Sequence, residues 1–409
     1  MLILSNDVTG GGAERVAAAH IHRLAQLGRH EIAAATCGPP PESLLPGRHF
    51  FPLDNFLSSP VTKLAGTLGV MLNRRAMERC LHTFRPDIIH MHAFTQFSPG
   101  ALKAIEAYKA ESKCKITLTH HNFAYICPND ALFNYRTGMV CEKCIGGSKA
   151  QIIRDNCYGS LSGSWGKYIQ KRSFYSMFSR GLIDLHIAPS CFMRDKLIAA
   201  CPKIGRVEVV YNPCLNKVRQ ALPPKTAGKI AFFGRISREK NVVSAVKAME
   251  QLSSTQPHLL VIGDGPDSSA LEKSIANSPV KDKIQFKRTF LSPDELYPLI
   301  EDAQFFILPS IWYENSPVAI VEALDMGMTP LVSNQGGMKE LLDWAGVGYK
   351  FEPDRPDTIA NCIERAIASR EQDEQILSGV MRDKLKVFTE ATYIEHIRKL
   401  YDEVEEWGH

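Results

Sequence analysis

The chain has 409 residues, 44% of them hydrophobic, and this length exceeds the size at which a single core usually stops growing, so we expect two domains. Its apolar stretches are of strand length or are interrupted by charges, which excludes a membrane-spanning helix of about 20 apolar residues. The net charge of +4 is unevenly distributed. Residues 1–212 contain 25 Lys and Arg and 15 Asp and Glu, so this part is basic, and the remaining residues contain 23 Lys and Arg and 29 Asp and Glu, so that part is acidic. The basic part suits an anionic lipid surface or a phosphate-bearing acceptor, although such an excess is more often only a solvated surface.

The N-terminus runs from Met1–Leu4 directly into Ser5–Asp7, without the basic start and longer apolar segment of a secretory signal. We therefore expect the protein in the cytoplasm. In that compartment the eleven cysteines are not expected to form a disulfide scaffold, and most of them are expected to be small buried apolar residues.

The first half of the chain alternates strand and helix patterns. Met1–Ser5 is followed by a helical segment, Ala13–Leu27, that Gly28 closes, and this is typical of the start of a βαβ series. The later patterns are strands at Glu31–Thr36, Asp87–Met91, Lys115–Thr119, Ile183–Ala188 and Val207–Tyr211, and a helix at Pro99–Ser112. They predict a parallel sheet in an N-terminal domain, residues 1–220, interrupted by an irregular Cys-rich insert at about 122–165.

A second series follows the best linker candidate, Leu215–Gly228, which contains two adjacent prolines and little periodicity. It predicts a C-terminal domain over residues 221–390. Its strand patterns are Lys229–Phe233, Leu259–Ile262, Ile284–Phe286, Phe305–Leu308 and Thr329–Val332, and its helical patterns are Val242–Leu252, Asp267–Ala276, Pro317–Met326, Met338–Trp344 and Pro356–Ala368. The last helical pattern, Tyr393–Trp407 within segment 391–409, could pack on either domain, including back on the N-terminal one.

The most informative segment runs from Trp312 to Ala323, directly after a strand. Ser316 is an expected N-cap and Pro317 fits the first helical position, so the helix start aims unpaired N–H groups at the carboxyl end of the sheet. A diphosphate would fit there. Glu322 stands in an apolar run, where an ionised carboxylate needs hydrogen-bond donors, and ribose hydroxyls could supply them. The alternative is a surface glutamate on a two-sided helix.

Two glutamates separated by seven residues, Glu314 and Glu322, resemble the donor-site signature of retaining glycosyltransferases of family 4, which have the GT-B fold. The resemblance covers nearly the whole chain. Its other parts occur in the family's order: Gly11-Gly12-Ala13-Glu14, Thr119-His120-His121-Asn122-Phe123, Gly234-Arg235 with Lys240, Gly263-Asp264-Gly265-Pro266, and Gly336-Gly337 with Glu340. It implies an α/β protein of two Rossmann-like, doubly wound domains that face a cleft, with the acceptor on the first domain and the donor on the second.

The resemblance also implies the roles of single residues. The residues that it makes catalytic are His121, which faces the reacting sugar, Glu314, which contacts the sugar hydroxyls, and Arg235 and Lys240, which contact the diphosphate. Charged donors at the diphosphate would neutralise the negative charge of the leaving group. The other donor-binding residues that it implies are Gly11, Gly12, Gly263, Gly265, Asn315, Ser316, Pro317, Val318 and Glu322, with Glu322 on the ribose. Where many family members have His-Asp, this chain has His121-Asn122, so no acidic group is expected there.

The two glycine loops do not indicate a dinucleotide site. The pattern G-x-G-x-x-G fails at its sixth position, which is Arg15 when counted from Gly10 and Ser268 when counted from Gly263, so hydride transfer loses its main support. Turn formation accounts for Gly263 and Gly265 as well as a ligand does.

Cys127, Cys141, Cys144 and Cys157 lie in the insert, with intervals of thirteen, two and twelve residues. Four thiolates would close a tetrahedral structural zinc site, and a lobe with few apolar residues needs such a cross-link. Buried or redox-active thiols are the alternative. No metal is expected to be required for catalysis.

These observations predict a retaining glycosyltransferase that moves a sugar from a nucleotide diphosphate donor to a saccharide acceptor. A lipid-linked acceptor in bacterial surface polysaccharide or lipopolysaccharide assembly is favoured, and no nucleic-acid partner is expected. The segment Trp165–Arg180 mixes aromatic and basic residues as a peripheral membrane site on the inner face of the cell membrane would, although such aromatics are somewhat more often core residues. A nucleotide-sugar epimerase of the same fold and a non-catalytic carbohydrate-binding protein are the alternatives.

Overall fold

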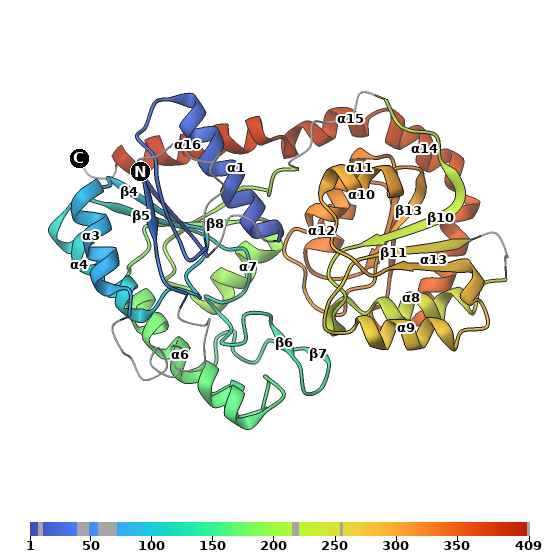
Figure 1. The fold of residues 1–409 in the computed structure, drawn as a ribbon, viewed down its shortest axis with the longest axis horizontal. Coiled ribbons are helices and arrows are strands. Elements are labelled where there is room, and N and C mark those ends of the chain that lie inside the picture. Colours follow the sequence, from blue (N-terminus) through green and yellow to red (C-terminus); the bar gives the residue numbers. More distant parts are fainter. Residues whose placement is uncertain (7–10, 39–48, 56–71, 215–220, 254–256, 407–409) are drawn as a thin grey trace. The chain divides into compact units, whose positions relative to one another are not determined.

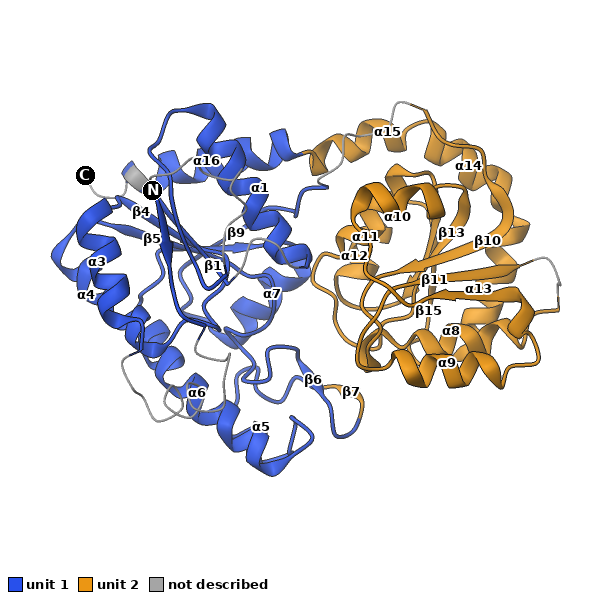
Figure 2. Ribbon diagram, in the orientation of Figure 1, with its two compact units in different colours: residues 1–137, 141–215, 390–409 blue, residues 138–140, 216–389 orange. Residues whose placement is uncertain are grey.

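The computed structural model describes residues 1–6, 11–38, 49–55, 72–214, 221–253 and 257–406. The chain forms two compact units (Figures 1 and 2). Unit 1 comprises Met1–Thr137, Cys141–Leu215 and Glu390–His409, and unit 2 comprises Gly138–Val140 and Asn216–Thr389.

Unit 1 contains a seven-stranded sheet in which every pairing between neighbouring strands is parallel. In spatial order its strands are β3 (Phe50–Pro52), β2 (Ala33–Thr36), β1 (Leu2–Ser5), β4 (Ile88–Met91), β5 (Lys115–Thr119), β8 (Leu185–Ala188) and β9 (Arg206–Val209). The strand order reverses between β1 and β4, so the carboxyl ends of these two strands form the switch point where open α/β sheets bind ligands.

The helices of unit 1 complete the βαβ units around this sheet. Among the described residues they are α1 (Gly12–Leu27), α3 (Arg74–Phe84), α4 (Pro99–Glu111), α5 (Gln151–Arg154), α6 (Leu161–Ser179), α7 (Cys191–Ala200) and the C-terminal α16 (Glu390–Glu406). Helix α1 ends at Gly28, whose left-handed φ of 63° closes the helix as the sequence predicts. The insert contains the short ribbon β6 (Phe133–Asn134) and β7 (Met139–Val140).

Helix α16 belongs to unit 1, although it follows unit 2 in the chain. Its buried face shares a hydrophobic core with the first helix and strand: Ile397 and Tyr401 pack in the cluster that contains Val16 and Ile3. The chain therefore returns to its first domain at its C-terminal end (Figure 2).

Unit 2 repeats the architecture with six parallel strands, in the order β12 (Ile284–Lys287), β11 (His258–Ile262), β10 (Thr226–Phe233), β13 (Ala303–Leu308), β14 (Thr329–Ser333) and β15 (Tyr349–Phe351). Its helical elements are the 3-10 turns η1 (Arg238–Lys240), η2 (Lys281–Lys283) and η3 (Leu385–Phe388), and helices α8 (Val242–Met249), α9 (Ser268–Ala276), α10 (Pro293–Ile300), α11 (Val318–Asp325), α12 (Gly336–Ala345), α13 (Pro356–Ala368), α14 (Arg370–Ser378) and α15 (Met381–Lys384). Here the switch point lies between β10 and β13.

The predicted α/β class with two Rossmann-like domains is confirmed, and most predicted elements are present with ends shifted by one to three residues. Part of the predicted linker, residues 215–220, lies outside the described residues, and its last residues, from Thr226 on, belong to strand β10. Gly10 also lies outside them. Helix α11 begins at Val318 with Pro317 as its N-cap, so the prediction of Ser316 as N-cap was wrong by one position.

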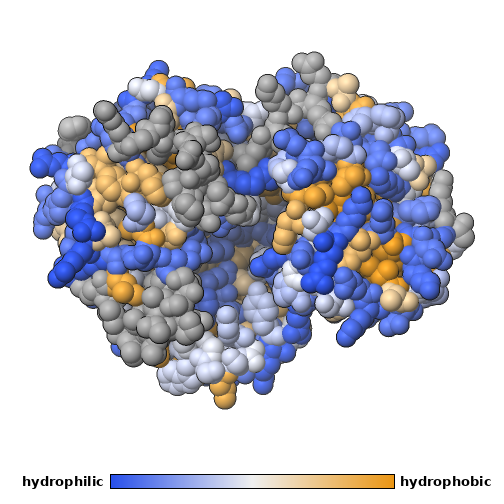
Figure 3. Space-filling model, in the orientation of Figure 1, coloured by the Kyte–Doolittle hydropathy of each residue, from blue (hydrophilic) through white to orange (hydrophobic). Residues whose placement is uncertain are grey.

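The described helices include none that is long and apolar enough to cross a bilayer. Figure 3 shows a mostly hydrophilic surface with scattered hydrophobic patches. The aromatic residues of α6 that were expected at a membrane surface differ in their exposure to solvent. Trp165 is 52% exposed, whereas Phe174 and Phe178 are buried. Lys171, expected at a lipid surface, is fully buried and forms a 2.6 Å ion pair with Asp130, because a buried ammonium group requires a counter-charge.

Candidate active site

The switch point of unit 2 brings two predicted catalytic residues together. Lys240 ends the turn η1 after strand β10, and Glu314 lies in the loop after the neighbouring strand β13. Because both loops leave the same edge of the sheet, the two side chains meet, and Lys240 Nζ lies 2.6 Å from Glu314 Oε1. The backbone N–H of Ile311 also donates to the carbonyl of Glu239 at 2.8 Å, which ties the two loops to each other.

Glu314 is a buried carboxylate with an asymmetric set of partners. Its Oε1 accepts from Lys240 Nζ, from Ser310 Oγ at 2.7 Å and from Trp312 Nε1 at 2.7 Å. Its Oε2 has no hydrogen bond to any residue that the structure describes. Burial raises the pKa of Glu314, but the Lys240 ammonium and these hydrogen bonds outweigh it and hold the pKa below its usual value. The group is therefore ionised at neutral pH, with one oxygen held and the other available to a ligand hydroxyl.

The loop that carries Glu314 is held in place by residues at the N-terminus of helix α12. The side-chain amide of Gln335 donates to the carbonyls of Ser310 and Trp312, each at 3.0 Å. The N–H of Gly337 donates to the carbonyl of Glu314 at 2.7 Å, and a Cβ at this glycine would lie 1.8 Å from the carbonyl oxygen of Asn315. The helix can approach this closely only because residue 337 has no side chain, so the loop geometry depends on it.

Arg235, the other predicted diphosphate contact, is 56% exposed and donates to Glu239 Oε1 at 2.6 Å. Glu239 itself is buried and also accepts from Ser237 Oγ at 2.8 Å. The guanidinium group is thus held at one end by a fixed carboxylate, and its remaining donors face solvent. Arg235 is not among the groups that contact Glu314 directly.

Glu322 is 5% exposed in helix α11, and its Oε1 accepts from the hydroxyl of Tyr297 at 3.0 Å. Tyr297 lies on helix α10. The sequence predicted that this buried carboxylate requires hydrogen-bond donors, and the contact with Tyr297 is consistent with that prediction. This donor is a tyrosine of the same unit, whereas the prediction named ribose hydroxyls.

Gly263 and Gly265 follow strand β11 and pack against the loop after β10. A Cβ at Gly263 would lie 1.9 Å from the carbonyl oxygen of Gly234, and one at Gly265 would lie 2.2 Å from that of Ile236. This close packing of the two loops requires glycine without any ligand. The glycines therefore shape the neighbourhood of Arg235, whether or not they also touch the donor.

In unit 1 the predicted residues lie at the second switch point. Gly11 is the N-cap of helix α1, and no atom of the described residues lies within 4 Å of a Cβ built on Gly12. A pocket at this edge of the sheet is lined by His121, with Asn6, Glu14, His92 and Asn122 among its neighbours. The remaining residues of the lining are Ser5, Ala13, Ala93, Phe94, Thr95, Leu118, Thr119 and His120.

His121 lies just beyond strand β5, and its Nε2 is 2.9 Å from His92 Nδ1. Burial lowers the pKa of His121 to about 4, so the imidazole is neutral at physiological pH. A neutral imidazole has one donor and one acceptor nitrogen, and it carries no charge with which to stabilise a charged group of a substrate.

Two family profiles match the chain. The family described as "Glycosyltransferase Family 4" matches residues 10–214, which is half of the chain, and "Glycosyl transferases group 1" matches residues 216–378. The chain belongs to glycosyltransferase family 4.

Relatives of this family 4 glycosyltransferase act on several sugars. The lipopolysaccharide 1,2-N-acetylglucosaminetransferase of Salmonella typhimurium is 28% identical over 239 residues, 54% of this chain and 62% of that enzyme. The GDP-mannose:cellobiosyl-diphosphopolyprenol alpha-mannosyltransferase of Xanthomonas oryzae is 27% identical over 174 residues, 41% of this chain and 45% of that enzyme. The matches thus span less than two thirds of either relative. Anabaena HepE in complex with UDP has the same fold, with a TM-score of 0.71 and 16% identity over 98% of this chain and 99% of that one.

The Cys-rich insert of this glycosyltransferase brings together part of the predicted zinc set. The potential ligand atoms of Cys141, Asp155 and Cys157 lie within 4.8 Å of one another, whereas Cys127 and Cys144 lie outside this trio and are buried. A hydrogen bond with Cys157 lowers the pKa of Cys141 to about 6. Asp155 is engaged by Lys143 Nζ at 2.9 Å. The donor set has the thiolate character that zinc prefers, but the described thiols are not arranged as a closed four-sulfur tetrahedron.

Sequence reasoning missed several residues that support the site. Ser310, Trp312 and Gln335 hold the Glu314 loop, and Tyr297 holds Glu322. Ser310 and Trp312 stand within four residues of Glu314, and this proximity is the signal that could have found them. Tyr297 and Gln335 are brought in by neighbouring helices, which no local pattern indicates.

Proposed function

We propose that the protein is a retaining glycosyltransferase that transfers a sugar from a nucleoside diphosphate donor to a saccharide acceptor. The observation that carries the proposal is the Lys240–Glu314 pair at the switch point of unit 2. It combines a cation suited to a diphosphate with an ionised carboxylate whose Oε2 has no partner among the described residues. The UDP bound by Anabaena HepE, which shares the fold, supports a nucleotide donor.

Each of these side chains contacts a different part of the donor. Glu314 Oε2 accepts from a hydroxyl of the sugar. Lys240 and the exposed end of Arg235 stabilise the negative charge that develops on the departing diphosphate, and they do so without a metal ion. The first N–H groups of α11 favour the same charge. Glu322, already held by Tyr297, accepts from the ribose, and His121 is assigned a contact with the transferred sugar.

We further propose a lipid-linked saccharide acceptor at the inner face of the cell membrane, in bacterial surface polysaccharide or lipopolysaccharide assembly. The acceptors in the names of the Salmonella and Xanthomonas relatives, a lipopolysaccharide and a diphosphopolyprenol, support this class. So does helix α6, which exposes Leu161, Trp165 and Ile169 at intervals of four residues, with Arg172 exposed beyond them. An apolar row with basic residues near it suits an anionic lipid surface.

Donor binding tests the proposal. Calorimetric titration of UDP and GDP should show binding of one of them to the native protein. Glu322→Gln should weaken that binding about 10- to 150-fold, because the loss of one charged hydrogen bond costs roughly 1.5–3 kcal/mol. Glu371→Gln, a matched change at an exposed position of α14, should leave binding unchanged. Equal affinity of the native protein and Glu322→Gln would remove Glu322 from the ribose site, and failure of every nucleotide to bind would contradict the donor class.

We also propose that the insert holds a structural zinc ion through Cys141 and Cys157, whose sulfur atoms lie close together, with Cys127 and Cys144 as the remaining predicted ligands. In the present arrangement these two lie outside the cluster, so zinc binding requires them to move toward it. The insert consists mostly of loops whose ordering costs conformational entropy, and thiolate ligation would add stabilisation to that of its buried apolar residues, among them Ile126, Leu132 and Phe133. Elemental analysis of protein prepared without chelator should find about one zinc per chain. The ion should be lost in Cys141→Ser/Cys157→Ser and retained in Cys191→Ser, which lies outside the insert. Native protein without zinc would leave these residues as thiols.

A further inference from the structure

A chain of hydrogen bonds, which we call the histidine chain, crosses unit 1 and ends at His121. The contacts are Thr119 Oγ1 to His90 Nε2 at 2.7 Å, His90 Nδ1 to the Tyr401 hydroxyl, the Tyr401 hydroxyl to His20 Nε2 at 3.2 Å, His20 Nδ1 to His92 Nε2 at 2.7 Å, and His92 Nδ1 to His121 Nε2 at 2.9 Å. Each link joins a side chain to the next, so the chain is continuous from a strand end to the pocket.

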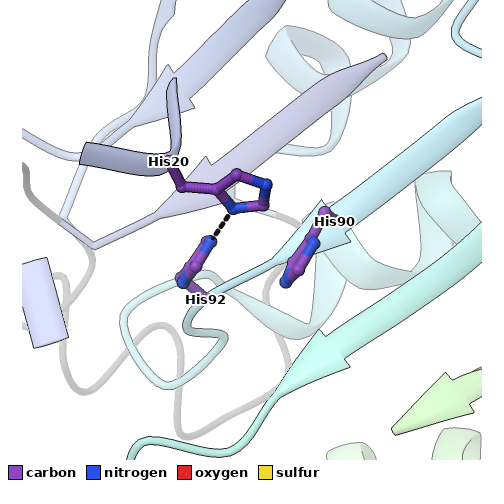
Figure 4. Close-up of side chains that lie close together, drawn as sticks. All are labelled: His20, His90 and His92. Atoms are coloured by element: carbon purple, nitrogen blue, oxygen red, sulfur yellow. Dashed lines mark hydrogen bonds between the residues drawn. The ribbon is translucent and has the colours of Figure 1, made fainter. Parts of the chain in front are cut away.

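The members come from separate parts of the fold. His20 lies on helix α1, His90 lies on strand β4, His92 follows that strand, and Tyr401 comes from the C-terminal helix α16. Figure 4 shows the imidazoles of His20, His90 and His92 converging, with the hydrogen bond between His20 and His92 drawn. The rings of His90 and His92 stack with their centroids 4.5 Å apart. All four residues are buried.

The hydrogen bonds of the histidine chain can be oriented in only two ways, because its histidines are neutral. Burial lowers the pKa of His20 to about 3, and burial and the neighbouring histidines lower the pKa of His90 and His92. A neutral imidazole has one N–H donor and one acceptor nitrogen, and a tyrosine hydroxyl has one proton. Every link must therefore donate in the same direction, either toward His121 or away from it.

The Thr119 hydroxyl decides the direction. If the chain donates toward His121, Thr119 gives its proton to His90 Nε2. If it donates the other way, Thr119 receives a proton from His90 and its own proton needs a further acceptor. Among the described residues, His90 is the one hydrogen-bond partner of the Thr119 side chain. A buried donor without a partner costs roughly 1–3 kcal/mol, so the direction toward His121 is favoured.

We propose that Tyr401 and His20, acting through His92, position His121 for sugar transfer by fixing its tautomer, with the proton on Nδ1 and Nε2 as acceptor. The proposal rests on the proposed function in one respect, the contact of His121 with the transferred sugar. It makes the C-terminal helix part of the site, although Tyr401 touches no reacting atom. Tyr401 and His20 are positioning residues, because they act on His121 only through the histidine chain.

A metal site is the alternative use of this cluster. Potential ligand atoms of His20, His90 and His92 lie within 4.8 Å of one another, which a metal site also requires. However, each of the six ring nitrogens of these three residues already has a partner in the histidine chain. A bound metal would have to break several of these hydrogen bonds. The geometry therefore favours the chain, and metal binding is an outcome that the test must detect.

The test compares Tyr401→Phe with Tyr393→Phe. Tyr393 lies on the same helix, its ring contacts His20 with centroids 5.8 Å apart, and its buried hydroxyl has no hydrogen-bond partner among the described residues. Both changes remove one oxygen beside the same histidine, but only the first interrupts the chain. Thr119→Val interrupts it at the other end and serves if Tyr401→Phe fails to fold.

Nitrogen-15 spectra of the histidine side chains of the full-length protein report the tautomers directly. In native protein and in Tyr393→Phe, His121 should show a protonated Nδ1 and an acceptor Nε2. In Tyr401→Phe, His121 should show a changed or mixed tautomer, and kcat should fall on the order of tenfold with an unchanged KM for the donor, because a wrongly protonated imidazole binds but does not assist.

Three results would overturn the proposal: an unchanged His121 tautomer in Tyr401→Phe, a protonated Nε2 in native protein, or a stoichiometric metal ion whose removal shifts the His20, His90 and His92 signals. A native protein that transfers no sugar but shows the predicted tautomers would refute the proposed function and leave the histidine chain intact, so the two failures are distinguishable.

Discussion

Replacing Lys240 by alanine will lower kcat at saturating donor by on the order of 100- to 1000-fold, the usual effect of removing a preorganised group that stabilises transition-state charge. Lys240 lies 2.6 Å from Glu314, and both side chains are largely buried. The substitution therefore also leaves a buried carboxylate without its counter-charge, which destabilises unit 2 by roughly 3–5 kcal/mol. Steady-state kinetics and the melting temperature measure the two effects separately.

Two further variants separate catalysis from folding. Lys247→Ala removes an exposed lysine of the neighbouring helix α8 and should alter neither kcat nor the melting temperature. The double variant Lys240→Ala/Glu314→Ala removes both members of the pair, so it should recover stability but not turnover. A loss confined to KM in Lys240→Ala would show that Lys240 only binds the ground state.

Acidification from pH 7 to pH 5 will open unit 1 while unit 2 stays folded. Unit 1 contains six histidines whose pKa values desolvation lowers: His20 and His186 to about 3 and His121 to about 4, with His90, His92 and His120 shifted in the same direction. In the unfolded chain these groups have their usual pKa near 6.5, so below that pH the unfolded state binds more protons than the folded one. The stability that these histidines contribute is complete above about pH 6.5, and it is lost as the pH falls from there toward their pKa values in the folded protein.

The expected size of the acid effect is large. Each such histidine costs about 1.4 kcal/mol per pH unit below 6.5, so the six together approach the whole stability of a typical domain near pH 5. Residues 216–389 contain a single histidine, His258, at an exposed position, which makes unit 2 an internal control. Hydrogen exchange followed by mass spectrometry, corrected for the intrinsic pH dependence of exchange, should show loss of protection in β1, β4 and β5 first. Simultaneous opening of both units, or earlier opening of unit 2, would contradict the prediction.

Local patterns predicted the elements well, because a strand or helix buried in an α/β layer carries its own periodicity. Lys115–Thr119 and Pro356–Ala368 have the predicted bounds, and Gly28 ends its helix as expected. The resemblance assigned Lys240 and Glu314 to the donor site, and the structure places them in loops after the neighbouring parallel strands β10 and β13. Each of these predictions depended only on residues within a short segment of the sequence.

Long-range contacts were not predictable in the same way. His90 and Tyr401 are 311 positions apart, and each histidine of the chain, taken alone, reads as an ordinary core residue. The helical pattern at the C-terminus did not say which domain it would cover, because an amphipathic face specifies burial but not a partner. The cysteine spacing indicated a cluster, but it could not show that Asp155 takes a place beside Cys141 and Cys157.

We expect a sugar to leave a nucleoside diphosphate at the Lys240–Glu314 site and to be transferred with retention of configuration. Proton NMR of reactions containing a nucleotide sugar, with and without a saccharide acceptor, tests it most directly. Release of nucleoside diphosphate should depend on the acceptor, and the product should have the anomeric configuration of the donor. A donor sugar that is altered without acceptor would indicate an epimerase, an inverted product would contradict retention, and glycan binding without donor turnover would contradict catalysis.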